Sequence, residues 1–91
     1  MYKIENVETL TLGTTAQTVK VMGLSCLIEN NDDSATVYFK ERRFDGKAVT
    51  TSNGWALGPG KSTPVPVSVM ELSLISDTAS ADVRVLLLDE Y

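Results

Sequence analysis

The stretch that decides the fold is TSNGWALGPG, residues 51–60. Its Asn-Gly pair and its Gly-Pro-Gly triplet mark two chain reversals, because glycine accepts φ values that other residues avoid and proline fixes its own φ. The residues on both sides alternate between apolar and polar with the period of two that is typical of half-buried strands. No window of the chain has a comparable helical period. The sequence therefore predicts an all-β protein.

Two segments in the first half of the chain alternate most regularly, LSCLIEN at 24–30 and ATVYFK at 35–40. The residues that separate them, NDDS, tolerate left-handed backbone and accept hydrogen bonds from their own main chain. We therefore predict that these two segments form a β-hairpin.

Further strands are predicted on both sides of the deciding stretch. A short strand is expected at 48–51, and TPVPVSV at 63–69 reads as an edge strand, because Pro64 and Pro66 cannot donate hydrogen bonds to a ladder. Two more strands are expected at 71–75 and 82–88. Turn signals recur about every 8–12 residues, which is the spacing of sandwiches and barrels.

The fold class that follows is a single antiparallel β-sandwich, Ig-like or jelly-roll-like, of about seven or eight short strands. One domain covers residues 1–91, and residues 1–8 either begin the first strand or form an N-terminal arm. The final strand, DVRVLLL, is apolar on both faces. Such a strand is buried twice, either in the centre of a sandwich or under a partner subunit, so Leu86 and Leu88 are candidate interface residues.

Composition and charge narrow the function. The chain has 91 residues, of which 43% are hydrophobic and 22% are charged, and its net charge is −4. An acidic chain lacks the basic surface that nucleic acid binding requires, so direct binding to nucleic acid is not expected. No apolar run has the ~20 residues of a membrane span, and the N-terminus lacks the apolar core of a signal peptide. We expect no membrane partner.

Enzyme activity is not expected. The chain has no histidine and one cysteine, Cys26, which lies on an apolar strand face where a free cysteine behaves as a small hydrophobe. The acidic pairs at 32–33 and 89–90 lack the ligand spacing of a calcium loop. We therefore predict no catalytic residue, no cofactor and no metal site.

Two other features are candidates for contacts with a partner. Trp55 lies in the turn-rich stretch and either caps the core or anchors an interface. The loop that contains Arg42, Arg43 and Phe44 mixes both charge signs around an aromatic residue, and loops are where binding residues concentrate.

In the order of its strands and turns the chain resembles small β-sandwich structural proteins of bacteriophages and prophages, of the head-decoration or head-fibre-like kind. The residues that carry the resemblance are CLIEN at 26–30, ATVYF at 35–39, NGWALGPGKS at 53–62 and DVRVL at 82–86. The resemblance covers roughly residues 24–88.

The resemblance implies a non-enzymatic virion structural or assembly protein, such as a capsid decoration protein. Such a protein is made in the cytoplasm of the bacterial host and acts in the virion. It binds its own copies as a homo-oligomer, with a trimer favoured, and docks on other virion proteins. The alternative function is a carbohydrate-binding or receptor-binding β-sandwich module, in which Trp55 and Tyr38 stack on the ligand.

Overall fold

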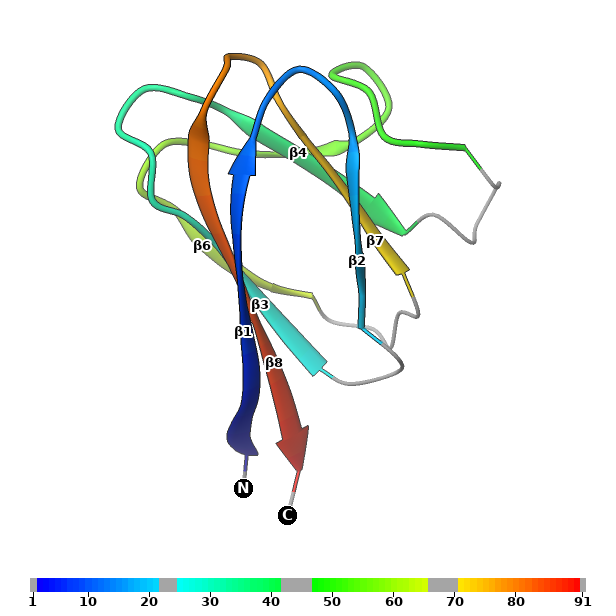
Figure 1. The fold of residues 1–91 in the computed structure, drawn as a ribbon, viewed down its shortest axis with the longest axis vertical. Coiled ribbons are helices and arrows are strands. Elements are labelled where there is room, and N and C mark those ends of the chain that lie inside the picture. The colour runs from blue at the N-terminus through cyan, green and yellow to red at the C-terminus, as the bar shows by residue number, and fades with distance from the viewer. Residues whose placement is uncertain (1, 22–24, 42–46, 66–70, 91) are drawn as a thin grey trace.

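The computed structural model describes residues 2–21, 25–41, 47–65 and 71–90. These residues form eight strands in two four-stranded antiparallel sheets and contain no helix. The two sheets face one another as the layers of a sandwich (Figure 1). The predicted all-β sandwich is therefore confirmed.

Each sheet is assembled from strands that are distant in the sequence. Sheet A has the order β1-β8-β3-β6 and consists of β1 (Tyr2–Leu12), β8 (Ala81–Glu90), β3 (Ser25–Asn30) and β6 (Ser62–Val65). Sheet B has the order β2-β7-β4-β5 and consists of β2 (Gln17–Lys20), β7 (Glu71–Ser76), β4 (Val37–Glu41) and β5 (Trp55–Leu57).

The pairing is nested, and this nesting defines the topology. β1 pairs with β8, β2 with β7, β3 with β6 and β4 with β5, so the chain folds as a doubled-over hairpin that is wound across both sheets. That arrangement is a jelly roll, which decides between the two topologies that the sequence left open. Residues 2–8 belong to β1 and pair with β8, so they are a strand and not a separate arm.

The predicted hairpin of residues 24–30 with residues 35–40 is wrong. β3 lies in sheet A and β4 in sheet B, so the segment between them crosses from one layer to the other. The cause is the side chain of Asn30, which is buried at the end of β3. Its Nδ2 donates to the carbonyls of Ala35, Leu57 and Gly58, and these bonds turn the chain toward sheet B.

The short strand predicted at 48–51 does not form either. Val49 is buried, but its backbone N–H donates to the side-chain Oγ of Ser73 in β7 and not to a backbone carbonyl of a strand ladder. The Asn-Gly reversal precedes β5, and the Gly58–Lys61 turn closes with a 3.2 Å bond from Lys61 N to Gly58 O. Gly60 has a φ of 69°, as the third residue of a type II turn requires.

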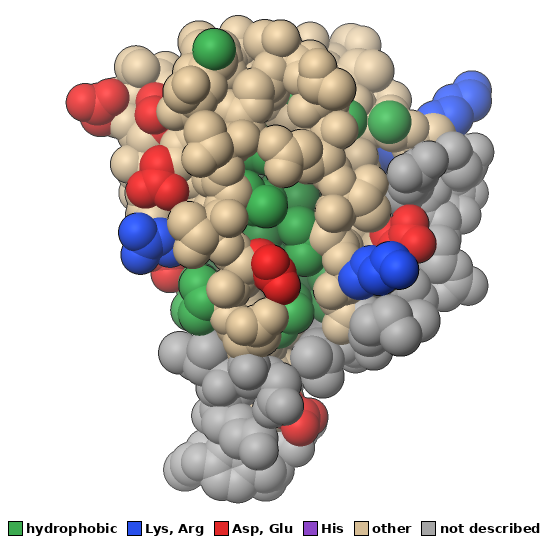
Figure 2. All heavy atoms as spheres, viewed as in Figure 1, with side chains coloured by type: hydrophobic (Ala, Val, Ile, Leu, Met, Phe, Trp, Pro, Cys, Tyr) green, Lys and Arg blue, Asp and Glu red, His purple; other side chains and the backbone are tan. Residues whose placement is uncertain are grey.

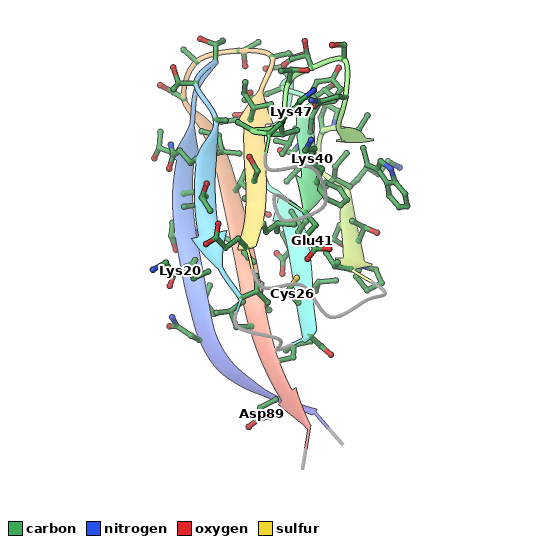
Figure 3. The ribbon with its side chains drawn as sticks, turned by 90° about the vertical axis from the view of Figure 1, so that its right-hand side faces the viewer. Lys20, Cys26, Lys40, Glu41, Lys47 and Asp89 are labelled. Atoms are coloured by element: carbon green, nitrogen blue, oxygen red, sulfur yellow. The ribbon has the colours of Figure 1, made fainter. Side chains whose placement is uncertain are left out.

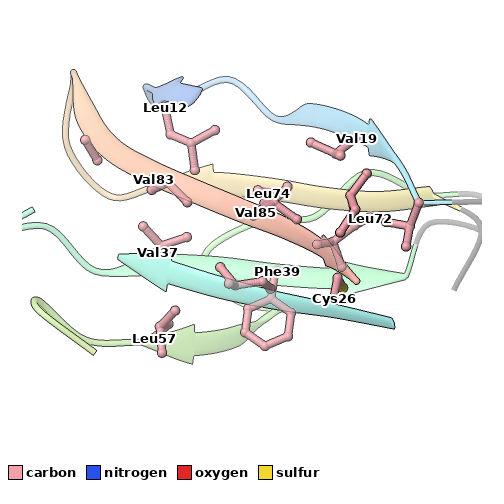
Figure 4. Packing of buried hydrophobic residues seen from close by; sticks show 14 of the residues in the cluster. Leu12, Val19, Cys26, Val37, Phe39, Leu57, Leu72, Leu74, Val83 and Val85 are labelled. Atoms are coloured by element: carbon pink, nitrogen blue, oxygen red, sulfur yellow. The ribbon is translucent and has the colours of Figure 1, made fainter. Parts of the chain in front are cut away.

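The remaining strand predictions hold. β7 and β8 form where the alternation placed them, and β6 with Pro64 lies at the edge of sheet A. Pro66 lies outside the described residues. The core between the sheets consists mainly of Val and Leu side chains from the inner faces of both sheets (Figure 4). Cys26 is part of it and is buried as predicted.

Candidate assembly surface

The outer face of sheet A carries a row of apolar side chains. Along β8, Val83, Val85 and Leu87 are buried on the inner face, so Leu86 and Leu88 lie on the outer face. The strand register places Leu86 between Val7 of β1 and Leu27 of β3. Pro64 of β6 lies next to Leu27. We call these four residues, Val7, Leu86, Leu27 and Pro64, the outer apolar row.

The outer apolar row crosses every strand of sheet A and is only partly covered. Val7 is 42% exposed and Pro64 is exposed, whereas Leu86 and Leu27 are half-buried between their neighbours. Leu88 adds a further half-buried leucine to the same face. Isolated apolar residues on a surface are ordinary, whereas a continuous row across a sheet is a candidate contact surface.

A polar row lies beside the outer apolar row. It consists of Thr9, Arg84, Glu29 and Ser62, which the register aligns across the same four strands. Arg84 and Asp82 form an ion pair with 4.0 Å between Nη2 and Oδ2, and both side chains are half exposed. An exposed pair of this kind contributes little to stability. The outer face of sheet A is therefore divided into a polar half and an apolar half.

The prediction of a final strand with two buried faces is half confirmed. The inner face of β8 is buried in the core, as expected for a strand in the middle of a sheet. On the outer face, Leu86 and Leu88 are half-buried within the described part of the chain.

Trp55 lies at the surface and is not part of the core. Its side chain is 69% exposed on β5, the edge strand of sheet B. Its ring meets Phe39 edge-on, with 6.3 Å between ring centroids and 62° between ring planes. The contribution of Trp55 to capping the core is therefore limited to this one contact with Phe39.

The other predicted contact residues, Arg42, Arg43 and Phe44, lie outside the described residues.

The two aromatic residues of the carbohydrate-binding alternative do not share a surface. Trp55 is the cross-strand partner of Phe39, whose side chain points into the sandwich, whereas Tyr38 is the partner of Ala56 and points outward. Tyr38 lines an open depression of about 660 Å³ on sheet B, together with threonines and Asp77. One aromatic residue in a depression is a weaker sugar platform than the predicted pair.

The ionisable groups of the described residues show two clear perturbations, and neither makes a reactive centre. Burial raises the pKa of the Cys26 thiol to about 11, so the thiol stays protonated at neutral pH. Hydrogen bonds from the backbone N–H groups of Ala35 and Ser34 lower the pKa of Asp32 below its ordinary 3.8. In Figure 3 the labels Lys40, Glu41 and Lys47 lie along the side of the sandwich that carries β4, whereas Lys20 lies on β2 and Asp89 near the end of β8.

Among the described residues there is no group of three or more His, Cys, Asp or Glu side chains that could hold a metal ion. In the same parts of the chain, no helix is long and apolar enough to cross a membrane.

Comparisons with known proteins support the fold. No family model matches the chain, and no curated protein matches it. One solved structure is similar, from a study titled "Bacillus endospore appendages form a novel family of disulfide-linked pili". It is 13% identical, with a TM-score of 0.51, over 97% of this chain and 82% of that chain. A likeness at this identity shows a shared β-sandwich fold.

Sequence reasoning found Leu86 and Leu88 but missed Val7, Leu27 and Pro64. Alternation within residues 24–30 puts Leu27 on the same face as the polar residues Ser25 and Glu29. Within its own strand, Leu27 therefore looks like an isolated apolar residue on a polar face. The row exists because β1, β3 and β6 are aligned against β8, and these strands are far apart in the sequence. The sequence signal for these residues is an apolar side chain on the outward face of a predicted strand. That signal identifies single residues but does not show that they are aligned in one row.

Proposed function

We propose that this protein is a non-enzymatic structural subunit that assembles with its own copies and docks on the surface of a larger particle. The observation that carries the proposal is the outer apolar row on sheet A, with Leu88 beside it. A single sandwich leaves this row in contact with water, and association removes it from water.

The outer apolar row is large enough to form part of an interface, but not a whole one. Burial of apolar surface contributes roughly 25 cal/mol per Å², and a stable interface covers about 800 Å² on each partner. Four side chains supply only a fraction of that area. They form the apolar centre, and the neighbouring polar row with Thr9, Arg84 and Glu29 forms one side of a polar rim.

We further propose that the particle is a bacteriophage virion, with the chain as a decoration or fibre subunit. The support is the resemblance of residues 24–88 to phage head proteins, together with the jelly-roll topology, which is common in viral capsids. Assembly would be non-covalent, because Cys26 is the one cysteine of the chain and it is buried. A covalent disulfide link between copies would require the core to open.

The first test is the solution mass of the intact chain, measured by light scattering over a wide concentration range. Leu86→Asp places a charge in the middle of the outer apolar row, and we expect it to lower the average mass of the assembly. Tyr38→Asp is the matched control, because Tyr38 is also half-buried and faces outward on a central strand, but in sheet B. Equal masses for the wild type and Leu86→Asp at every concentration would refute the proposed contact.

The second test addresses the particle. Gold-labelled antibodies against the purified chain should decorate phage particles produced by the strain that encodes it. Labelling confined to other structures, such as surface filaments, would support the proposal of a structural subunit and refute the proposal that the particle is a virion. Binding of glycans at the Tyr38 depression, abolished by Tyr38→Ala, would favour the carbohydrate-binding alternative instead.

A further inference from the structure

The edge strands of the two sheets differ greatly in length. β2 and β6 have four residues each and β5 has three, and β6 also contains Pro64. β1 has eleven residues and no proline. Short edges and edge prolines prevent a sheet from pairing with other chains. A register shift interrupts β1 between Ile4 and Asn6, but from Asn6 to Leu12 the strand is regular and presents an edge without a proline or a bulge.

The hydrogen bonds around β1 establish which of its backbone groups face this edge. The carbonyl of Asp82 accepts from Asn31 N at 2.9 Å, so Asp82 directs its peptide groups away from β1. Thr11, which is opposite Asp82, therefore directs its own N–H and C=O away from β8. A 3.0 Å bond from Gln17 Nε2 to the Thr11 carbonyl agrees with this orientation. Because the backbone N–H and C=O groups of successive residues in a strand point to opposite sides, those of Thr9 and Val7 also face the free edge.

Of these edge-facing groups, those of Val7 and Thr9 lack partners within the described part of the chain. Gln17 takes up the carbonyl of Thr11, but no described residue bonds the edge-facing N–H or C=O of Thr9 or Val7. The edges of β1 and β2 lie side by side at the front of Figure 1. In the same view, Figure 2 shows a hollow between them in which hydrophobic side chains are visible. The sandwich is thus open along this side.

We infer that the β1 edge binds a second copy of this chain, by antiparallel pairing of β1 with the partner's β1 about a two-fold axis. An antiparallel strand edge is self-complementary, because each outward N–H and C=O pair meets an identical pair from the other copy. Sheet A and the partner's sheet A would then form one continuous sheet, as in strand-addition complexes. The inference rests on the proposed self-association and names the edge that performs it.

The position of Val7 favours a second copy over an unrelated strand. Val7 is the end of the outer apolar row at the free edge, and it is 42% exposed. A two-fold axis perpendicular to the sheet keeps both outer faces on one side, so the two rows join into a single longer apolar strip. An unrelated strand would satisfy the hydrogen bonds but would not extend the row. The same pairing covers the hollow between β1 and β2.

This contact makes a dimer the basic unit, whereas the resemblance favours a trimer. The edge joins two copies, and the lengthened apolar strip then docks against further subunits or against the particle. The two surfaces can therefore be separated by mutation. We expect Leu86→Asp to stop assembly at the dimer, and we expect loss of the edge contact to release monomers.

A proline at position 9 tests the edge directly. Thr9→Pro removes an N–H that points to the free edge and leaves the bonds between β1 and β8 in place, as prolines on edge strands do. Leu10→Pro is the control, because the N–H of Leu10 points toward Val83 of β8. We expect Thr9→Pro to be monomeric at concentrations where the wild type is dimeric, with little change in melting temperature. Leu10→Pro should lower the melting temperature strongly.

Hydrogen exchange of the wild type gives a second readout that does not depend on a variant folding. The amides of Val7 and Thr9 should exchange at least tenfold more slowly in the concentrated, associated protein than in the dilute monomer. If the wild type associates while these two amides remain unprotected, the edge contact is refuted and self-association stands. If the wild type stays monomeric at every concentration, both the edge contact and the proposed function are refuted.

Discussion

Asn30 and Leu57 are joined by a 3.0 Å hydrogen bond from the side-chain Nδ2 of Asn30 to the Leu57 carbonyl, which ties the end of β3 in sheet A to β5 in sheet B. The same amide group also serves the carbonyls of Ala35 and Gly58, and its Oδ1 accepts from the N–H of Asp32 at 3.1 Å. Asn30 is 1% exposed. One buried side chain thus fixes the corner at which the chain passes from one sheet to the other.

Replacement of Asn30 by alanine should therefore destabilise the fold. The change leaves buried carbonyl groups without donors, and each such loss costs about 1–3 kcal/mol. We expect a decrease of about 3 kcal/mol in the free energy of unfolding, measured by urea denaturation. Asn31→Ala is the control, since Asn31 is exposed and uses its backbone N–H for its bond to Asp82. Equal stabilities for the two variants would contradict this account of the corner.

Acid should destabilise the same corner through Asp32. Its carboxylate accepts from Ala35 N at 2.8 Å and Ser34 N at 3.1 Å, and these bonds lower its pKa in the folded state. A lowered pKa stabilises the fold above the unfolded value of 3.8, and this contribution is lost as the pH falls through the folded value. Asp32→Asn should lower the melting temperature at pH 7. Below about pH 4 the melting temperature of this variant should fall less steeply with decreasing pH than that of the wild type. Parallel curves of melting temperature against pH for the two proteins would argue against this role of Asp32.

The buried thiol of Cys26 has an opposite dependence on pH. Its pKa is raised from 9.0 to about 11 in the folded state, so it contributes stability that is fully present below pH 9 and is lost as the pH rises toward 11. Folded protein should react with a thiol reagent at pH 8 much more slowly than unfolded protein. Cys26→Ala should lose less stability than the wild type between pH 9 and 11. A fast reaction of the folded protein would mean that the thiol is accessible.

Gly54 should not tolerate a side chain, although its φ is ordinary. A Cβ atom at this position would lie 2.5 Å from Cγ2 of Val49 and 3.1 Å from Cβ of Tyr38. Val49 is buried and has little room to move. We expect Gly54→Ala to cost about 1–3 kcal/mol of unfolding free energy, as overpacking of a core does. Gly13→Ala is the control, because a Cβ there meets nothing within 4 Å, and it should be nearly neutral.

The local parts of the fold could be predicted from the sequence. Alternation along β3 identifies Cys26 and Ile28 as core residues, and the Gly-Pro-Gly turn forms as expected with Gly60 in the left-handed region. Pro64 correctly indicates an edge strand. These features depend on a residue and its immediate neighbours, and short-range backbone chemistry determines them.

The pairing of strands could not be predicted in the same way. The segment after Asn30 has the composition of a hairpin loop, but Asn30 finds its partners at Leu57 and Gly58, far along the chain. The outer apolar row was missed for a related reason, because it exists only once β1, β3 and β6 are aligned against β8. The sequence left two roles open for Trp55, capping the core or anchoring an interface, and its exposed position on β5 depends on the pairing of β5 with β4.

The central place of β8 in sheet A also sets the order in which the molecule can fold. β1 precedes β8 in the chain, with six strands between them, and β8 is the strand that pairs with both β1 and β3. During synthesis β1 therefore emerges from the ribosome with both of its edges unpaired, and sheet A closes only after the ten residues of β8 have also emerged. Long-range pairing of this kind folds slowly and exposes strand edges to other nascent chains. In polysomes the newly made copies, held close together, have their first opportunity to meet before any of them is complete.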